Sequence, residues 1–161
     1  MKNPLLTFGL AVLVVAAVIA AVFFVQRGSH LELQGKVLKV RTAPLDENSS
    51  VAVVDFRFQN LADFDFEVLK VTVTMEDSSG AKIDGTTVSE VDAGRLFQAI
   101  PLLGQKYNPS LIVRNSIRPH ATEDRMIAAR FEVPEEKLEK RKQLTLRIEP
   151  YKGEVSEIKE K

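Results

Sequence analysis

The 161-residue sequence contains no cysteine and only two histidines, His30 and His120. Without cysteine the chain has no disulfide, no thiolate metal site and no cysteine nucleophile, and two histidines are too few for a metal site built from histidine alone. The sequence also lacks G-x-x-x-x-G-K-[ST], G-x-G-x-x-G and H-E-x-x-H, the motifs of phosphate, dinucleotide and zinc sites. We therefore expect no cofactor, no metal ion and no catalytic residue.

The sequence also has no excess of positive or negative charge. The chain has 22 Lys+Arg and 22 Asp+Glu. Because Lys2 and Arg27 precede the first acid, Glu32, residues 28–161 carry 20 positive and 22 negative charges, a net charge of −2. Nucleic-acid-binding domains are typically basic. We expect no nucleic-acid partner.

One long apolar run is present, at residues 5–25, and it contains no charged residue. As a helix its 21 residues would extend about 31 Å, against a hydrocarbon core of about 30 Å. The run is longer than the h-region of about 7–15 residues in a cleaved signal peptide, which is the alternative. We expect a single-pass transmembrane helix that binds membrane lipid, after a short head at residues 1–4 and before a polar joint at residues 26–30.

The charges that flank this run disagree about orientation. Lys2 favours a cytoplasmic N-terminus, whereas Arg27, Lys36, Lys39 and Arg41 on the other side favour the opposite. A short basic head before a long apolar run is typical of a signal anchor. We therefore expect the domain to lie outside the cytoplasm.

Period-2 alternation dominates residues 31–150. Its clearest example has Ala52, Val54, Phe56 and Phe58 on one face, and we expect the odd positions, Asp55 among them, to face water. About seven such segments are separated by turn residues, with no alternation of strands and helices. This pattern predicts a mainly β fold, an antiparallel immunoglobulin-like β-sandwich.

Two short helical insertions interrupt these strands, at residues 89–100 and 134–141. The first begins with a Ser89-x-x-Asp92 cap and ends at Pro101, and the second has Pro134 in its first turn. We expect residues 151–161 to form a charged, flexible tail.

Residues 51–85 read VAVVDFRFQNLADFDFEVLKVTVTMEDSSGAKIDG. An alternating strand ends at an asparagine, an aromatic residue lies in the short loop that follows, and an acidic-Gly hairpin closes a second strand. This segment resembles the membrane-anchored immunoglobulin-like sandwiches of the desiccation-related late-embryogenesis-abundant (WHy-type) and FxLYD-type domains. The corner that is Asn-Pro-Asn in that family is Gln59-Asn60-Leu61 here. The resemblance implies a non-enzymatic sandwich and assigns no catalytic residue.

The segment at residues 96–113 is the candidate partner-binding region, because it is apolar and yet rich in turn formers. We expect Leu102, Leu103 and Tyr107 to contact a protein partner if at least two of them are substantially exposed and adjoin one another, and to cap the sandwich if they are buried. The predicted function is a binding or structural role in the cell envelope, without catalytic activity.

The alternative function is a small envelope enzyme, or an enzyme accessory subunit, that uses the region of His120. A hydrolytic triad would need a nucleophile and an acid beside this histidine, and Ser116 and Asp124 are near it in sequence. His120 would then lie within hydrogen-bond reach of an acid or a hydroxyl at a concave site.

Overall fold

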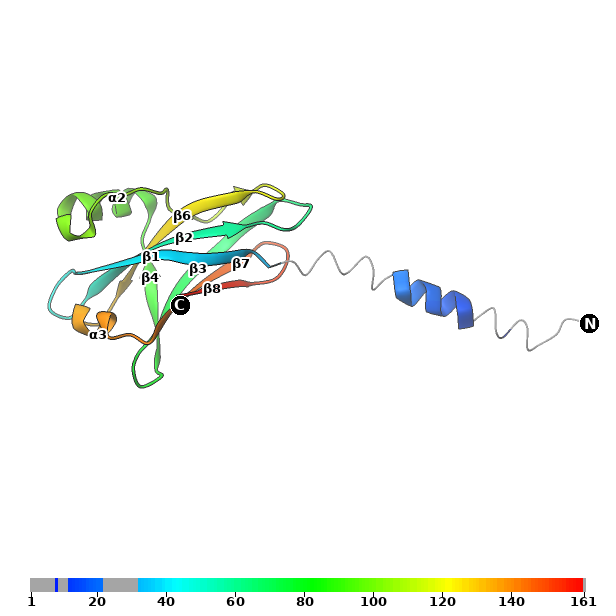
Figure 1. The fold of residues 1–161 in the computed structure, drawn as a ribbon, viewed down its shortest axis with the longest axis horizontal. Helices are drawn as coiled ribbons and strands as arrows, with labels where there is room; N and C mark the ends of the chain where they lie inside the picture. Colours follow the sequence, from blue (N-terminus) through cyan, green and yellow to red (C-terminus); the bar gives the residue numbers. More distant parts are fainter. Residues whose placement is uncertain (1–7, 9–11, 22–31, 161) are drawn as a thin grey trace, which may run out of the picture.

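The computed structural model describes residue 8, residues 12–21 and residues 32–160. Residues 8 and 12–21 are helical, and residues 32–160 form one mainly β domain (Figure 1). Its elements, in chain order, are β1 (Gln34–Pro44), β2 (Ser50–Gln59), β3 (Phe66–Glu76), β4 (Lys82–Thr87), α2 (Glu90–Ala99), η1 (Pro101–Leu103), β5 (Ser116–Ile117), β6 (Thr122–Phe131), α3 (Glu135–Glu139), β7 (Gln143–Pro150) and β8 (Ser156–Lys159).

The strands are antiparallel and pair in the order β1-β2-β6-β4-β3-β7-β8, with β5 beside β3. Strand β4 joins the two layers of the sandwich, because it pairs with β3 up to Gly85 and then with β6 through Thr86 and Thr87. Glycine is required at this crossing, since a Cβ on Gly85 would lie 2.7 Å from the ring of Phe131. The mainly β, antiparallel fold predicted from the sequence is confirmed, with eight strands rather than seven.

The main core lies between the layers. The even positions of β2 are all buried, and across the β2–β6 ladder Ala52 lies opposite Ala129 and Val54 opposite Ile127. Phe56 and Phe58 stack with their ring centroids 5.7 Å apart. The expectation that these side chains fill the core is confirmed, because their period-2 spacing matches the pleat of the strand.

The odd face of β2 was expected to face water, and for most of the strand this was wrong. Val51, Val53 and Asp55 are buried, and only Arg57 is exposed. Helix α2 and the turn η1 lie on this face and form a second apolar cluster with it, made of Ala43, Val51, Val53, Ala93, Leu103, Met126 and Ala128. Strand β2 is therefore covered on both faces.

One further expectation differs from the structure. The predicted flexible tail, residues 151–161, contains β8, which pairs with β7 and buries Ser156 and Ile158. The N–H of Leu33, just before β1, donates to Oγ of Ser156 at 2.8 Å, which ties the start of β1 to β8. The two predicted helices are present as α2 and α3.

The predicted transmembrane segment, residues 5–25, lies partly outside the described residues, and so do the head and the joint. Across residues 8, 12–21 and 32–160, no helix has both the length and the apolar character needed to cross a membrane.

Candidate functional site

Arg41 of β1 fastens the loop at residues 101–109 to the sandwich. Its guanidinium donates to Oδ2 of Asp55 on the neighbouring strand at 2.7 Å, and to the carbonyls of Leu103 at 2.5 Å and Gln105 at 2.8 Å. Asn108 donates to the other carboxylate oxygen of Asp55 at 3.0 Å. One buried ion pair therefore binds the loop at residues 103, 105 and 108.

The ion pair is shielded from water. The side chains of Arg41 and Asp55 are 9% and 5% exposed, and the rings of Phe97 and Tyr107 lie 4.9 and 5.9 Å from the guanidinium carbon. A buried charge is tolerated only when its partners satisfy it. Here two carbonyls and a carboxylate accept from the two terminal guanidinium nitrogens and two aromatic rings flank the group, whereas Nε of Arg41 has no hydrogen-bond partner among the described residues.

A second contact joins the loop to the start of α2. Glu90 accepts from Nζ of Lys106 at 2.5 Å and from the backbone N–H of Ser110 at 2.8 Å. Burial alone would raise the pKa of the Glu90 carboxyl, but the hydrogen bonds from Lys106 and Ser110 outweigh it and lower that pKa to about 2. Glu90 is therefore charged at neutral pH and holds the loop from its far side.

The three residues predicted to contact a partner do not share one environment. Leu102 and Tyr107 are 79% and 71% exposed, whereas Leu103 is fully buried in the second cluster. The η1 turn places Leu103 beneath α2 with its carbonyl on Arg41, so this side chain follows the capping alternative. Two of the three side chains meet the exposure expected of a binding edge.

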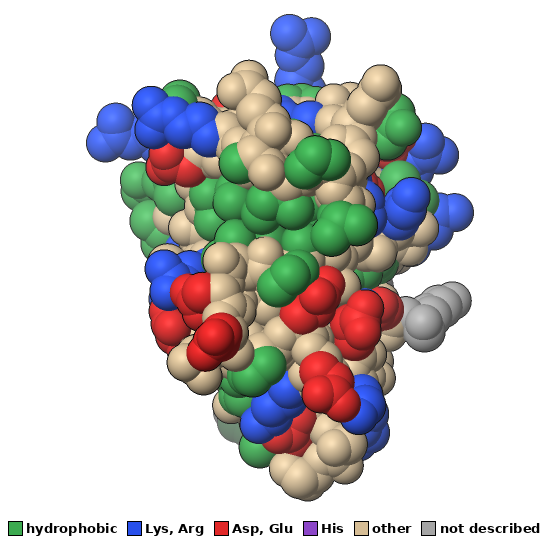
Figure 2. Space-filling view, turned by 90° about the vertical axis from the view of Figure 1, so that its left-hand side faces the viewer, with side chains coloured by type: hydrophobic (Ala, Val, Ile, Leu, Met, Phe, Trp, Pro, Cys, Tyr) green, Lys and Arg blue, Asp and Glu red, His purple; other side chains and the backbone are tan. Residues whose placement is uncertain are grey.

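Apolar side chains also gather on the end of the sandwich that carries α2 and α3, with acidic and basic side chains around them (Figure 2). On this side of α2, a shallow hollow of about 360 Å³ is lined by Leu45, Val51, Val88, Leu96 and Ala99. Asp92, Arg95 and Arg130 complete its lining. The loop at residues 101–109 therefore lies next to further accessible apolar surface.

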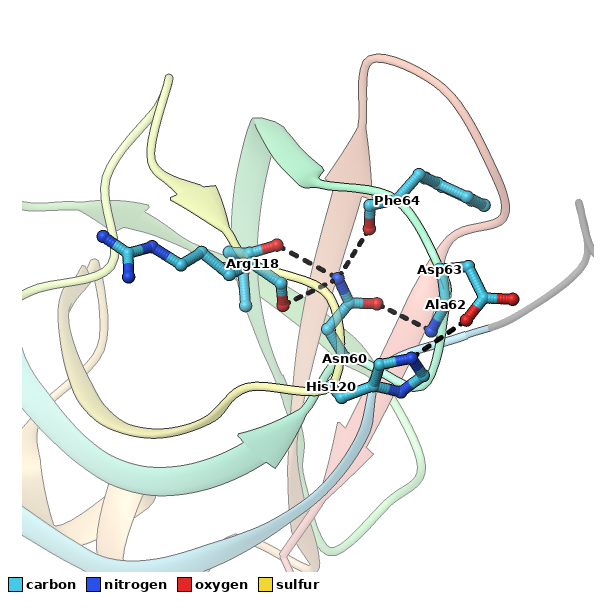
Figure 3. A network of polar contacts seen from close by, with 7 residues as sticks. Asn60, Ala62, Asp63, Phe64, Arg118 and His120 are labelled. Atoms are coloured by element: carbon cyan, nitrogen blue, oxygen red, sulfur yellow. Dashed lines mark hydrogen bonds and ion pairs between the residues drawn. The ribbon is translucent and has the colours of Figure 1, made fainter.

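Asn60 organises the opposite end of the sandwich (Figure 3). Its buried Nδ2 lies 2.9–3.1 Å from the carbonyl oxygens of Phe64, Ile117 and Arg118, and its Oδ1 accepts from the N–H of Ala62 at 3.0 Å. This single side chain locks the β2–β3 loop to the β5–β6 loop. Asn60 thus has a structural role at the corner that the family resemblance singled out.

His120 lies at the edge of this corner (Figure 3). Its Nε2 is 2.9 Å from Oδ1 of Asp63, with the two side chains 62% and 95% exposed. Asp124 pairs with Arg57 instead, and within residues 32–160 no hydroxyl hydrogen-bonds to the His120 ring. The described residues thus supply a histidine–aspartate pair but not the hydrogen-bonded nucleophile that a triad requires.

In the part of the chain that the structure describes, no group of three or more His, Asp or Glu side chains is placed to hold a metal ion. A polar hollow of about 490 Å³ covers the outer face of β3, β7 and β8, lined by threonines and by equal numbers of acidic and basic residues.

No family model matches the chain, and no curated protein matches it either. Among solved structures, the chain is similar to an uncharacterised β-sandwich protein from Clostridium difficile 630, with 12% sequence identity and a TM-score of 0.42. The alignment covers 81% of this chain and 86% of that chain. The fold assignment rests on the strand pairing described above. The resemblance to WHy-type and FxLYD-type domains stays a prediction.

Proposed function

We propose that the chain is a membrane-anchored immunoglobulin-like β-sandwich that binds a protein partner in the cell envelope and catalyses no reaction. The observation that carries this proposal is the loop at residues 101–109, which Arg41 and Glu90 hold in place while Leu102 and Tyr107 point their side chains to solvent. A loop held in one conformation loses little entropy when it docks. Tyrosine suits such a contact, because its ring contributes area while its hydroxyl stays hydrated.

The test is a double variant, Leu102→Ser with Tyr107→Ser, compared with Leu38→Ser. Leu38 is 44% exposed on β1 and belongs to no proposed contact. We expect the double variant to lose the partner that co-purifies with the wild-type chain from detergent-solubilised membranes, while its thermal midpoint stays unchanged. Unfolding of the double variant, or equal loss of the partner in Leu38→Ser, would show that the loop is only part of the fold.

The anchor is tested separately by an alkaline wash of membranes. We propose that residues 5–25 span the bilayer with the domain outside the cytoplasm, so the full-length chain should stay in the pellet. Release of the full-length chain would contradict the anchor. A chain that begins near Ala21 would indicate a cleaved signal peptide instead.

The absence of catalysis is supported by the exposure of His120 and Asp63, because a water-exposed pair gains little from its mutual contact. We expect His120→Ala to leave both folding and partner binding unchanged. A loss of function in that variant would favour the alternative, an enzyme or accessory subunit that uses this histidine.

A further inference from the structure

Strand β3 has a gap along the edge that faces away from β7. Strand β4 pairs with β3 only from Val73 to Glu76, and then turns away toward β6. At the other end of β3, the N–H of Arg114 donates to the carbonyl of Val68. Within residues 32–160, no strand pairs with the stretch of β3 between Val68 and Val73 on this side.

The backbone of Val71 points into that gap. Backbone N–H and C=O groups alternate in direction along a strand. The carbonyl of Glu76 points toward β7, because it accepts from the N–H of Lys142 at 2.8 Å, just before β7 begins. Val71 lies five positions before Glu76, so its N–H and C=O groups point away from β7. The same holds for Val73, which pairs with Gly85 of β4. One donor and one acceptor are available there for a further strand.

An apolar groove of about 580 Å³ follows this gap, within the range of about 300–1,000 Å³ typical of binding sites. We call it the β3 groove. Val91, Ile112 and Val113 are 64%, 41% and 50% exposed along it. Its apolar lining comes from β3, the β4–α2 junction, β6 and the loop before β5, and includes Val71, Val88, Val91, Leu111, Ile112 and Val113.

Two basic residues lie at or next to the lining of the β3 groove. Lys70 lines it, and also lines the polar hollow on the outer face of β3, while Arg114 follows Val113, a lining residue, in the sequence. Both side chains are exposed, and no ion pair joins either of them to a carboxylate of residues 32–160. The one acid of the lining, Glu90, is already bonded to Lys106 and to the N–H of Ser110. A ligand with a carboxylate would complement Lys70 and Arg114.

We propose that the β3 groove binds an extended segment of a partner protein, which adds to β3 as a short strand opposite Val71. The open backbone groups can pair with an extended chain, and the apolar lining fits aliphatic side chains at alternate positions of that chain. Lys70 and Arg114 favour an acidic residue at one end of it. The site is separate from Leu102 and Tyr107, so it can hold or fail independently of the function proposed above.

The probe is a phage-displayed library of random heptapeptides, panned on the full-length chain in detergent micelles. We expect it to enrich sequences with aliphatic residues at alternate positions and an Asp or Glu near one end. A fluorescein-labelled copy of the enriched peptide is then titrated by anisotropy. Val91→Asp and Val113→Asp should each raise its Kd at least about tenfold, while Leu38→Asp, at a similarly exposed position on β1, should not.

Hydrogen exchange of the wild-type chain gives an independent measurement that needs no variant. In the free protein the amide of Val71 should exchange faster than that of Val73, which β4 protects, and saturating peptide should slow it at least about tenfold. The proposal is overturned if no such peptide is enriched, if the enriched peptide binds Val113→Asp as tightly as wild type, or if Val71 gains no protection.

Discussion

Asp55→Ala tests whether the buried ion pair holds the molecule together. Without this carboxylate, the Arg41 guanidinium keeps only the carbonyls of Leu103 and Gln105, and Asn108 loses its acceptor. Because both side chains of the pair are less than 10% exposed, the remaining charge stays buried. Breaking one partner of such a pair costs about 3–5 kcal/mol, out of about 5–15 kcal/mol for a domain.

The measurement is urea unfolding of a chain that begins at Gly28, followed by far-ultraviolet circular dichroism. With a slope of about 2 kcal/mol per molar urea, Asp55→Ala should lower the midpoint by about 1.5–2.5 M. The control is Asp124→Ala, which breaks the pair that Asp124 forms through two hydrogen bonds with Arg57 of β2. Those side chains are 50% and 36% exposed, so the control should lose less than about 1 kcal/mol.

A third variant separates the loss of the pair from the loss of charge balance. Arg41→Met with Asp55→Leu removes both charges, and should recover most of the stability that Asp55→Ala loses. If Asp55→Ala is as mild as Asp124→Ala, the pair is hydrated and does not hold the loop at residues 101–109.

Two other predictions follow from the contacts at the two ends of the sandwich. Asn60→Ala should lower the free energy of unfolding by about 2–4 kcal/mol in the same urea assay, because buried backbone groups left without a partner cost about 1–3 kcal/mol each; a loss below 1 kcal/mol would show that the corner does not depend on this side chain. Glu90→Gln should be less stable than wild type at neutral pH. The folded-state pKa of Glu90 is about 2, below its ordinary value of 4.5. The difference in the free energy of unfolding should therefore persist above pH 4.5 and vanish as the pH falls toward 2. A difference that stays constant from pH 7 to pH 2 would mean that the charge of Glu90 contributes nothing.

The sequence predicted the main core well, because Phe56 and its even-numbered neighbours alternate with residues of another character. It did not predict the burial of Asp55, because the one charged residue was enough to suggest that this face of β2 is exposed to solvent. The sequence did contain a signal for this burial. Val51 and Val53 lie on the same face as Asp55, and two valines on one face of a strand indicate that another element packs against it. What covers them is α2, which is remote in sequence, so alternation within one strand could not show it.

Two other differences have local causes. Strand β8 has one apolar residue at a buried position, Ile158, among charged neighbours, so its sequence cannot be told from a solvated tail. Leu102 and Leu103 are adjacent and chemically identical, and only the path of the η1 turn decides which of them is buried. Hydrophobicity thus located the candidate loop, while the partners of Arg41, distant in sequence, determine its orientation.

The most direct test of the proposed function is site-specific photo-cross-linking in membranes of cells that make the full-length chain. A benzophenone amino acid is placed at position 102 or 107, where the native side chains are 79% and 71% exposed, and at position 38 as the control. We expect one light-dependent adduct of the same mass from positions 102 and 107, and none from position 38. No adduct from either loop position, or the same adduct from position 38, would contradict the claim that this loop binds a partner.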